Sequence, residues 1–162
     1  MTGVQTCALP ILEMTELNFV ELINQVIGEF EEKFEERNLQ MVVHFDEEEA
    51  IICADGRRLW RVLENVFGNV SKYAMENTRV YVDMNVNRPN VRLSLKNISA
   101  QPLNITADEL TERFIRGDVS RNTEGSGLGL SIAKDLVQLQ GGTFNLYLDG
   151  DLFKVTIEFK MK

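Results

Sequence analysis

The segment "NTEGSGLGLSIAKDLVQLQGG", residues 122–142, places three glycines on alternate positions directly before a helical pattern. Glycine costs about 1 kcal/mol relative to alanine inside a helix, so Gly125, Gly127 and Gly129 must serve another purpose. Glycine lets a ligand approach the backbone, and a helix that begins there has free N–H groups for an anion. The segment lacks the pattern of a P-loop or of a dinucleotide fingerprint. By itself it indicates either a phosphate site or a hinge.

Apolar periodicity on both sides of this segment predicts the remaining elements. After it, "TFNLYL" and "LFKVTIEF" read as two strands joined by a hairpin turn at Asp149-Gly150. Before it, helices are predicted from Asn18, where Glu21 would complete a capping box, and from about Asp55. The runs "LQMVVHF" and "AIICA" read as a pair of strands around "DEEE", and "TRVYVDMNV" and "NVRLSLKN" as a pair around "NRPN".

The order of these elements predicts the fold class. Strands come in adjacent pairs between helices, which favours antiparallel hairpins over a doubly wound parallel sheet. We expect an α/β two-layer sandwich, with three long helices on one face of a mixed, mainly antiparallel sheet. The irregular stretch from Ile98 to Gly127 is long enough to form a lid or binding loop.

Composition excludes several classes of protein. The 162 residues suggest one domain, and 44% hydrophobic with 26% charged residues argue against a disordered or membrane-spanning chain. A net charge of −8 argues against general nucleic-acid binding. The two cysteines have no metal-ligand spacing, and the single histidine, His44, lies in an expected strand.

Residues 1–12 do not share the pattern of the rest of the chain. The segment "MTGVQTCALPIL" resembles the read-through peptide that sequencing adapters leave in draft sequences. The alternative is the tail of a preceding helix. We therefore place the folded domain at residues 16–160.

The second predicted helix carries polar side chains on one face. Asn65, Asn69 and Lys72 follow one another at steps of four and three residues, and Tyr73 flanks the same face. Amide oxygens can bind a hard cation such as Mg²⁺, which is often shared with nucleotide phosphates, and a lysine can add charge there. The simpler alternative is a solvated helix surface, although two asparagines in mid-helix are unfavourable.

Three motifs in this order resemble the catalytic ATP-binding domain of bacterial sensor histidine kinases, a branch of the GHKL superfamily with the Bergerat fold. "RVLENVFGNVSKYA" resembles the N box of that family, "ERFIRGD" the F box and "GSGLGLSIAKDLVQLQGG" a glycine box. The resemblance covers about Glu16 to Lys160. It implies a Bergerat fold with a long ATP lid, and ATP and Mg²⁺ as cofactors.

The resemblance also implies roles for individual residues. Asn69 would coordinate Mg²⁺ with support from Asn65, Lys72 would contact phosphate, and Tyr73 would pack along the base. The remaining implied residues belong to the lid and the glycine box. Phe114 would anchor the lid, and Arg116 and Arg121 would contact phosphate. Gly125, Gly127 and Gly129 would let the lid close, and Leu128 between them would also line the nucleotide site.

One box departs from the family pattern. The family has an Asp-x-Gly-x-Gly segment whose aspartate accepts a hydrogen bond from the adenine amino group, but here Asn97 and Ser99 stand at the aspartate and the first glycine. An amide oxygen can still accept that bond, as a weaker neutral partner. Adenine specificity is therefore expected to be less secure than phosphate binding.

Phosphoryl transfer is favoured over ATP hydrolysis. Related ATPases of the superfamily carry a glutamate base at the position of Asn65, and an amide cannot take a proton at neutral pH. Glu64 is adjacent but rotated about 100° around the helix. The alternatives are a degenerate nucleotide-binding docking module and a serine kinase of the anti-sigma type.

The resemblance implies partners and a location beyond this chain. His44 cannot act as the phosphoacceptor, so we expect that histidine on a separate dimerisation domain, with a response regulator downstream. The chain is expected to be a cytoplasmic domain of a protein attached to the cell membrane.

Overall fold

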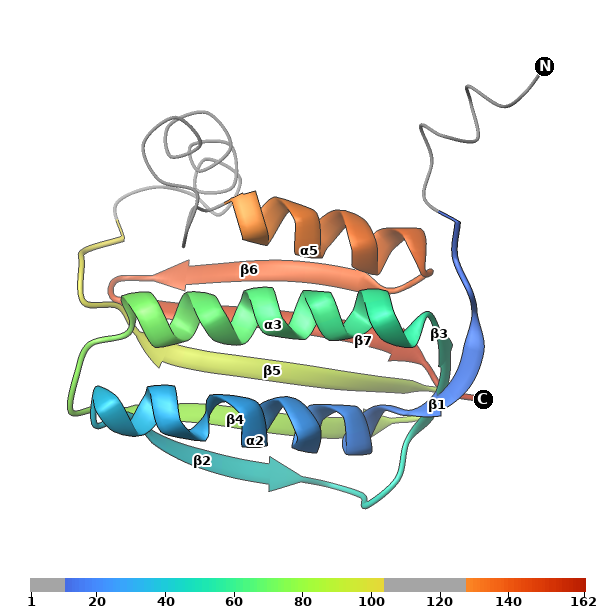
Figure 1. Ribbon diagram of the computed structural model, residues 1–162, viewed down its shortest axis with the longest axis horizontal. Helices are drawn as coiled ribbons and strands as arrows, with labels where there is room; N and C mark the ends of the chain where they lie inside the picture. Colours follow the sequence, from blue (N-terminus) through green and yellow to red (C-terminus); the bar gives the residue numbers. More distant parts are fainter. Residues whose placement is uncertain (1–10, 104–127) are drawn as a thin grey trace.

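The computed structural model describes residues 11–103 and 128–162, and it shows the helices together on one face of a twisted sheet (Figure 1). In chain order the elements are β1 (Thr15–Asn18), α2 (Phe19–Glu36), β2 (Gln40–Phe45), β3 (Ile51–Ala54), α3 (Gly56–Tyr73), β4 (Arg79–Asn87), β5 (Asn90–Ile98), α5 (Leu128–Leu139), β6 (Thr143–Asp149) and β7 (Leu152–Lys160).

The main sheet confirms the expected mixed, mainly antiparallel architecture. Its strand order is β2-β4-β5-β7-β6, in which β2 and β4 are parallel and the other neighbours are antiparallel. A second, two-stranded sheet pairs β1 with β3. Helices α2, α3 and α5 form the second layer of the sandwich (Figure 1).

Aromatic side chains join the first two helices. The rings of Phe30 and Phe34 on α2 lie 5.9 and 6.5 Å from the ring of Phe67 on α3, and all three residues are buried. Aromatic pairs at such spacings stabilise a core by about 0.5–1.5 kcal/mol beyond the area that they bury. The predicted apolar face of α2 is therefore the face that packs on α3.

Strands β2 and β3 were expected as a pair, and this expectation is wrong. β2 pairs with β4 and β3 pairs with β1, a short strand that the sequence analysis missed. The reason lies at Asn18, whose side-chain oxygen caps α2 at the amide of Val20 and also accepts from the amide of Ala50 at 3.0 Å. The amide of Phe19 donates to the carbonyl of Ala50, so the chain before β3 is aligned with β1.

The last hairpin turns one residue later than expected. Asp149 pairs with Leu152, so the turn residues are Gly150 and Asp151 and not Asp149 and Gly150. Gly150 adopts a φ of 61°, a value that two-residue hairpins require and that glycine reaches without strain.

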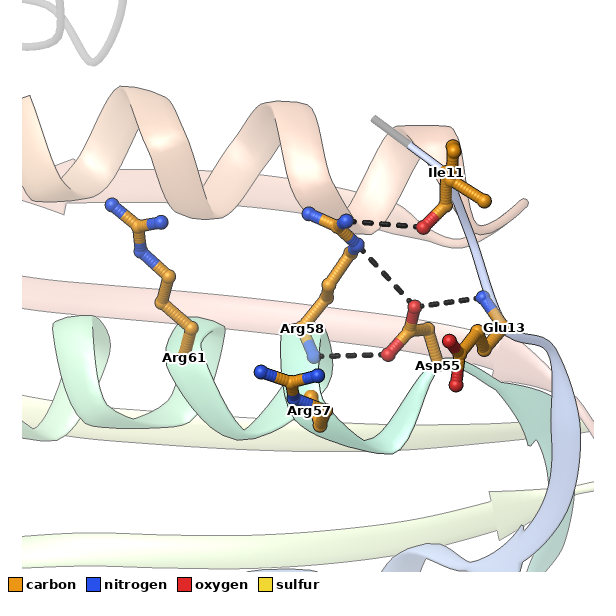
Figure 2. Close-up of a pocket in the computed structure, with 6 residues that line it drawn as sticks. All are labelled: Ile11, Glu13, Asp55, Arg57, Arg58 and Arg61. Atoms are coloured by element: carbon orange, nitrogen blue, oxygen red, sulfur yellow. Dashed lines mark hydrogen bonds and ion pairs between the residues drawn. The ribbon is translucent and has the colours of Figure 1, made fainter. Parts of the chain in front are cut away.

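Helix α3 begins at Asp55, whose carboxylate is almost fully buried (Figure 2). It accepts hydrogen bonds from the amides of Glu13 at 2.9 Å and Arg58 at 3.2 Å, and the guanidinium of Arg58 lies 3.3 Å away. Burial alone would raise the pKa of Asp55, but these amide hydrogen bonds and the charge of Arg58 outweigh it. The pKa is therefore below its ordinary value.

The Asp55 cap predicts a pH-dependent stability. Asp55→Ala should lower the free energy of unfolding by about 1–2 kcal/mol at pH 7, measured by urea denaturation. Because the pKa of Asp55 in the folded protein lies below its ordinary value of 3.8, the ionised carboxylate stabilises the fold above that pH, and the benefit is lost as the pH falls further. Asp55→Asn keeps a capping oxygen, so its deficit should shrink toward pH 3. An equal deficit at both pH values would contradict this account; Asp135→Ala on the exposed side of α5 is the control.

Two glycines should respond in opposite ways to alanine. A Cβ on Gly142 would lie 2.8 Å from Phe159 and 2.9 Å from the carbonyl of Glu158, so Gly142→Ala should destabilise by about 1–3 kcal/mol. A Cβ on Gly28, within α2, would meet nothing within 4 Å, so Gly28→Ala should stabilise by about 1 kcal/mol. Thermal unfolding of both variants tests the pair, and a stabilising Gly142→Ala would refute the packing argument.

Candidate functional site

One face of α3 carries the predicted row of polar side chains. Asn65 and Asn69 are half-buried and Lys72, at the last turn, is exposed. The adjacent, core-facing side holds apolar residues that are fully buried, such as Val62 and Val66, each three residues before an asparagine of the row. The row therefore lies beside the packed face of the helix and remains within reach of a ligand.

Helix α5 begins against the first residue of this row, Asn65. A Cβ on Gly129 would lie 3.5 Å from Cγ and 3.7 Å from Oδ1 of Asn65, which is ordinary contact distance. The backbone of the first turn of α5 therefore directly faces the Asn65 amide. Figure 1 shows α5 running alongside α3. The structure brings together Gly129 and Asn65, two residues from separate motifs.

Asn97 lies near the end of β5, on the helix side of the sheet. It is only 4% exposed, and its side-chain oxygen has no hydrogen-bonding partner within the part of the chain that the structure describes. A buried acceptor without a partner lowers the stability of a fold by about 1–3 kcal/mol, and a ligand that donates a hydrogen bond to it would offset this cost. The position where the sequence departs from its family pattern thus holds an unsatisfied polar group.

The last turn of α3 is held by contacts that sequence reasoning missed. The guanidinium of Arg37 donates to the carbonyl of Ser71 at 2.7 Å, and the amide of Ala100 donates to the carbonyl of Tyr73 at 2.9 Å. Cations are favourable at helix C-termini, because the last carbonyls are unpaired. No local pattern marks Arg37, which lies 34 positions from Ser71. It fixes the turn that carries Lys72.

The described residues include only some of the site residues predicted from the sequence. Tyr73 is exposed beside Lys72 at the end of α3, and Leu128 is the first residue of α5. Five expected site residues, which belong to the predicted lid and glycine box, lie outside the described residues: Phe114, Arg116, Arg121, Gly125 and Gly127.

A different polar group gathers at the other end of α3. A cavity of about 230 Å³ is lined by Arg57, Arg58 and Arg61 together with Glu13 and Asp55 (Figure 2). Asn65 lies about 15 Å along the helix from Asp55, since each residue adds 1.5 Å. Arg61, which also lines the cavity, lies four residues before Asn65, so the cavity ends one helical turn from the asparagine row.

Two features of residues 11–103 and 128–162 bear on the chemistry. No three His, Cys, Asp or Glu side chains gather there in a metal-binding group. None of the helices in these ranges has the length and apolar character needed to cross a bilayer.

Comparison with known families decides what kind of domain this is. Residues 54–162, more than half of the chain, match the family described as histidine kinase-, DNA gyrase B- and HSP90-like ATPases. The chain belongs to this family. The match includes the asparagine row, Asn97 and the start of α5.

Individual relatives point to one branch of the family. The chain is 28% identical to the probable sensor protein PcoS of Escherichia coli, over 90% of this chain and 32% of that protein. It is 28% identical to the sensor protein VanS of Enterococcus faecium, over 81% of this chain and 34% of that protein. The chain thus spans about a third of the length of these curated relatives.

A solved structure gives the same result. The catalytic domain of histidine kinase ThkA superposes with a TM-score of 0.77 at 28% identity, covering 92% of this chain and 96% of that domain. Three helices on a mixed, mainly antiparallel sheet are therefore the fold of histidine kinase catalytic domains, as expected.

The placement of Glu64 predicts that it takes no part in catalysis. It is exposed on α3, one residue and about 100° away from Asn65. Glu64→Gln should change nucleotide affinity and any slow ATP hydrolysis by less than about twofold, because the side chain cannot reach the asparagine row. A loss of turnover in a phosphate-release assay would show that Glu64 acts as a base after all.

Proposed function

We propose that this chain binds Mg·ATP and transfers the γ-phosphoryl group to a histidine on a separate dimerisation domain. The single observation that carries the proposal is the close approach of Gly129, in the first turn of α5, to Asn65, in the polar row of α3. Amide oxygens that can bind a cation thereby lie beside the start of a helix, where backbone N–H groups can bind an anion. A metal–nucleotide phosphate is a ligand that uses both.

The residues present fit the implied cofactors. Asn65 and Asn69 offer amide oxygens, which suit a hard cation that keeps several waters and binds phosphates. The unpaired oxygen of Asn97 fits a donor group on the nucleotide base. In this arrangement Asn69 would hold Mg²⁺ and Lys72 would contact a phosphate. We also propose the lid and phosphate-site roles expected from the sequence for Phe114, Arg116, Arg121, Gly125 and Gly127.

The chemistry of this site is positioning and neutralisation of charge. Bound with ATP, Mg²⁺ would offset negative charge on the phosphates. Lys72 would place one positive charge beside them, and the α5 backbone would add partial positive charge. Asn65 offers no base to activate water, and Glu64 is exposed away from it. These features favour transfer to a protein acceptor over hydrolysis.

The acceptor histidine belongs to another domain. His44, the single histidine of the sequence, lies on β2 at one edge of the main sheet, whereas α5 packs near β6 at the other edge. The proposed partners are therefore a dimerisation domain that carries the acceptor and a response regulator downstream. ThkA has been solved in complex with the response regulator TrrA, which supports the second partner. We propose a cytoplasmic domain of a membrane-attached parent, because the relatives are sensor proteins.

One observation favours a second candidate, a degenerate docking module. The family's aspartate is replaced by Asn97, a neutral partner that binds the base more weakly. The asparagine row, Lys72 and Gly129 are nevertheless all in place. The two candidates differ in whether millimolar ATP binds at all.

Calorimetric titration of ATP with and without Mg²⁺ tests the proposal. The wild type should bind with a magnesium-dependent affinity, and Asn69→Ala should weaken it by about tenfold or more, because a bond to a charged group is lost. Asn145→Ala on the exposed side of β6 is the matched control and should bind as the wild type does. No binding at millimolar ATP would leave only the docking module.

A transfer assay then tests the acceptor. Incubated with labelled ATP, the chain should not label itself, and it should label a histidine-bearing dimerisation domain added in trans. The phosphohistidine bond is acid-labile, so the label should be lost in acid. Acid-stable label on a serine would instead identify a serine kinase.

A further inference from the structure

Asn97 is a buried amide that no neighbour satisfies. The residue is 4% exposed, and its oxygen is sealed from solvent without a hydrogen-bonding partner in the described ranges. Buried polar side chains are nearly always paired in native proteins, and the exceptions need a specific reason. A ligand that brings its own donor is such a reason.

The amide lies on the ligand side of the sheet. Along β5 it continues the buried row of Leu93 and Leu95, beneath the helix layer, whereas Lys96 contacts Tyr81 on the other face. The end of β5 is joined to the end of α3, since the amide of Met75 donates to the carbonyl of Ile98 at 2.8 Å. Asn97 therefore sits at the same end of α3 as Lys72.

We propose that Asn97 reads the purine base and accepts both adenine and guanine, so that the domain uses GTP as well as ATP. The proposal rests on the nucleotide site proposed above. The edge of adenine presents an amino donor beside a ring-nitrogen acceptor, and the edge of guanine presents a carbonyl acceptor beside a ring N–H donor. A carboxamide has one acceptor and one donor group, so rotation by 180° about its terminal bond matches either edge.

An aspartate at this position would select adenine. An ionised carboxylate is an acceptor only, so with the base held in the same position it can receive the adenine amino group but would oppose the carbonyl oxygen of guanine. A site rejects a base strongly when binding would leave a buried polar group without a partner. An amide that can rotate pairs with either base and leaves no group unpaired. The exchange of one oxygen for an NH₂ group removes the basis for discrimination.

A series of nucleotides tests this in the unmodified protein. ATP, GTP and ITP are titrated calorimetrically with Mg²⁺; ITP has the carbonyl and ring N–H of guanine without its amino group. The dissociation constants should fall within about tenfold of one another, the range expected for one neutral hydrogen bond. A preference for ATP above about a hundredfold would overturn the proposal.

Two variants then assign the selectivity to residue 97. Asn97→Asp should widen the preference for ATP over GTP by about tenfold or more, and Asn97→Leu should weaken both nucleotides about equally. Asn145→Asp adds the same charge on the exposed side of β6 and should leave the ratio unchanged. Thermal unfolding confirms that each variant is folded at the assay temperature. An ATP-to-GTP ratio that is the same in wild type and Asn97→Asp would refute the assignment.

The failure of this inference can be told apart from that of the proposed function. If no nucleotide binds the wild type, the nucleotide site and the base-reading role fall together. The other outcome is that ATP binds the wild type, Asn69→Ala weakens that binding as expected, and substitutions at residue 97 leave the ATP-to-GTP affinity ratio unchanged. In that case only the base-reading role is refuted.

Discussion

The geometry of the site depends on a buried hydrogen bond at its far end. The backbone amide of Asp55 donates to the side-chain oxygen of Gln140 at 2.8 Å, and the Gln140 amide donates to the carbonyl of Leu136 at 2.8 Å. Both residues are about 95% buried, so neither group has water as an alternative partner. This link fixes the end of α5 to the start of α3. Gly129 lies near the other end of α5. Its close approach to Asn65 follows from this link and from the packing between α3 and α5.

Apart from the short strand β1, the types of the described elements were predicted from the sequence, but the pairing of β2 and β3 was not. Period-3.6 and period-2 patterns are local, so α2, α3 and the β4–β5 hairpin were predicted with nearly correct bounds. The parallel pairing of β2 with β4 joins residues 39 positions apart. It depends on the hydrogen bond from the amide of Ala50 to the side chain of Asn18, which holds β3 beside β1 and leaves β2 to pair with β4. Neither residue differs in kind from many others in the sequence. The turn at Gly150 was displaced by one position because register, unlike turn composition, is set by both strands.

The same distinction applies to the site. Asn65, Asn69 and Lys72 were found because helical spacing places them on one face, a property of a single segment. Arg37 and Gln140, which hold the ends of α3, act across 34 and 85 positions and leave no signal in the pattern. That the side-chain oxygen of Asn97 is buried without a partner likewise could be found only from the structure. The alternation along β5 predicted an inward position, but the lack of a partner is a property of all its neighbours at once.

The position of β7 has a consequence for the order in which the domain can form during synthesis. β7 comes last in chain order among the described strands, yet it lies between β5 and β6 and pairs with both. Until it leaves the ribosome, β6 has no place in the sheet, and the inner edge of β5 is an open row of hydrogen-bonding groups. Since domains complete folding only when their non-local pairings are available, this one must stay incomplete until nearly its whole length has been made. A nascent chain stalled before β7 would expose an unpaired strand, which is the kind of surface that chaperones protect.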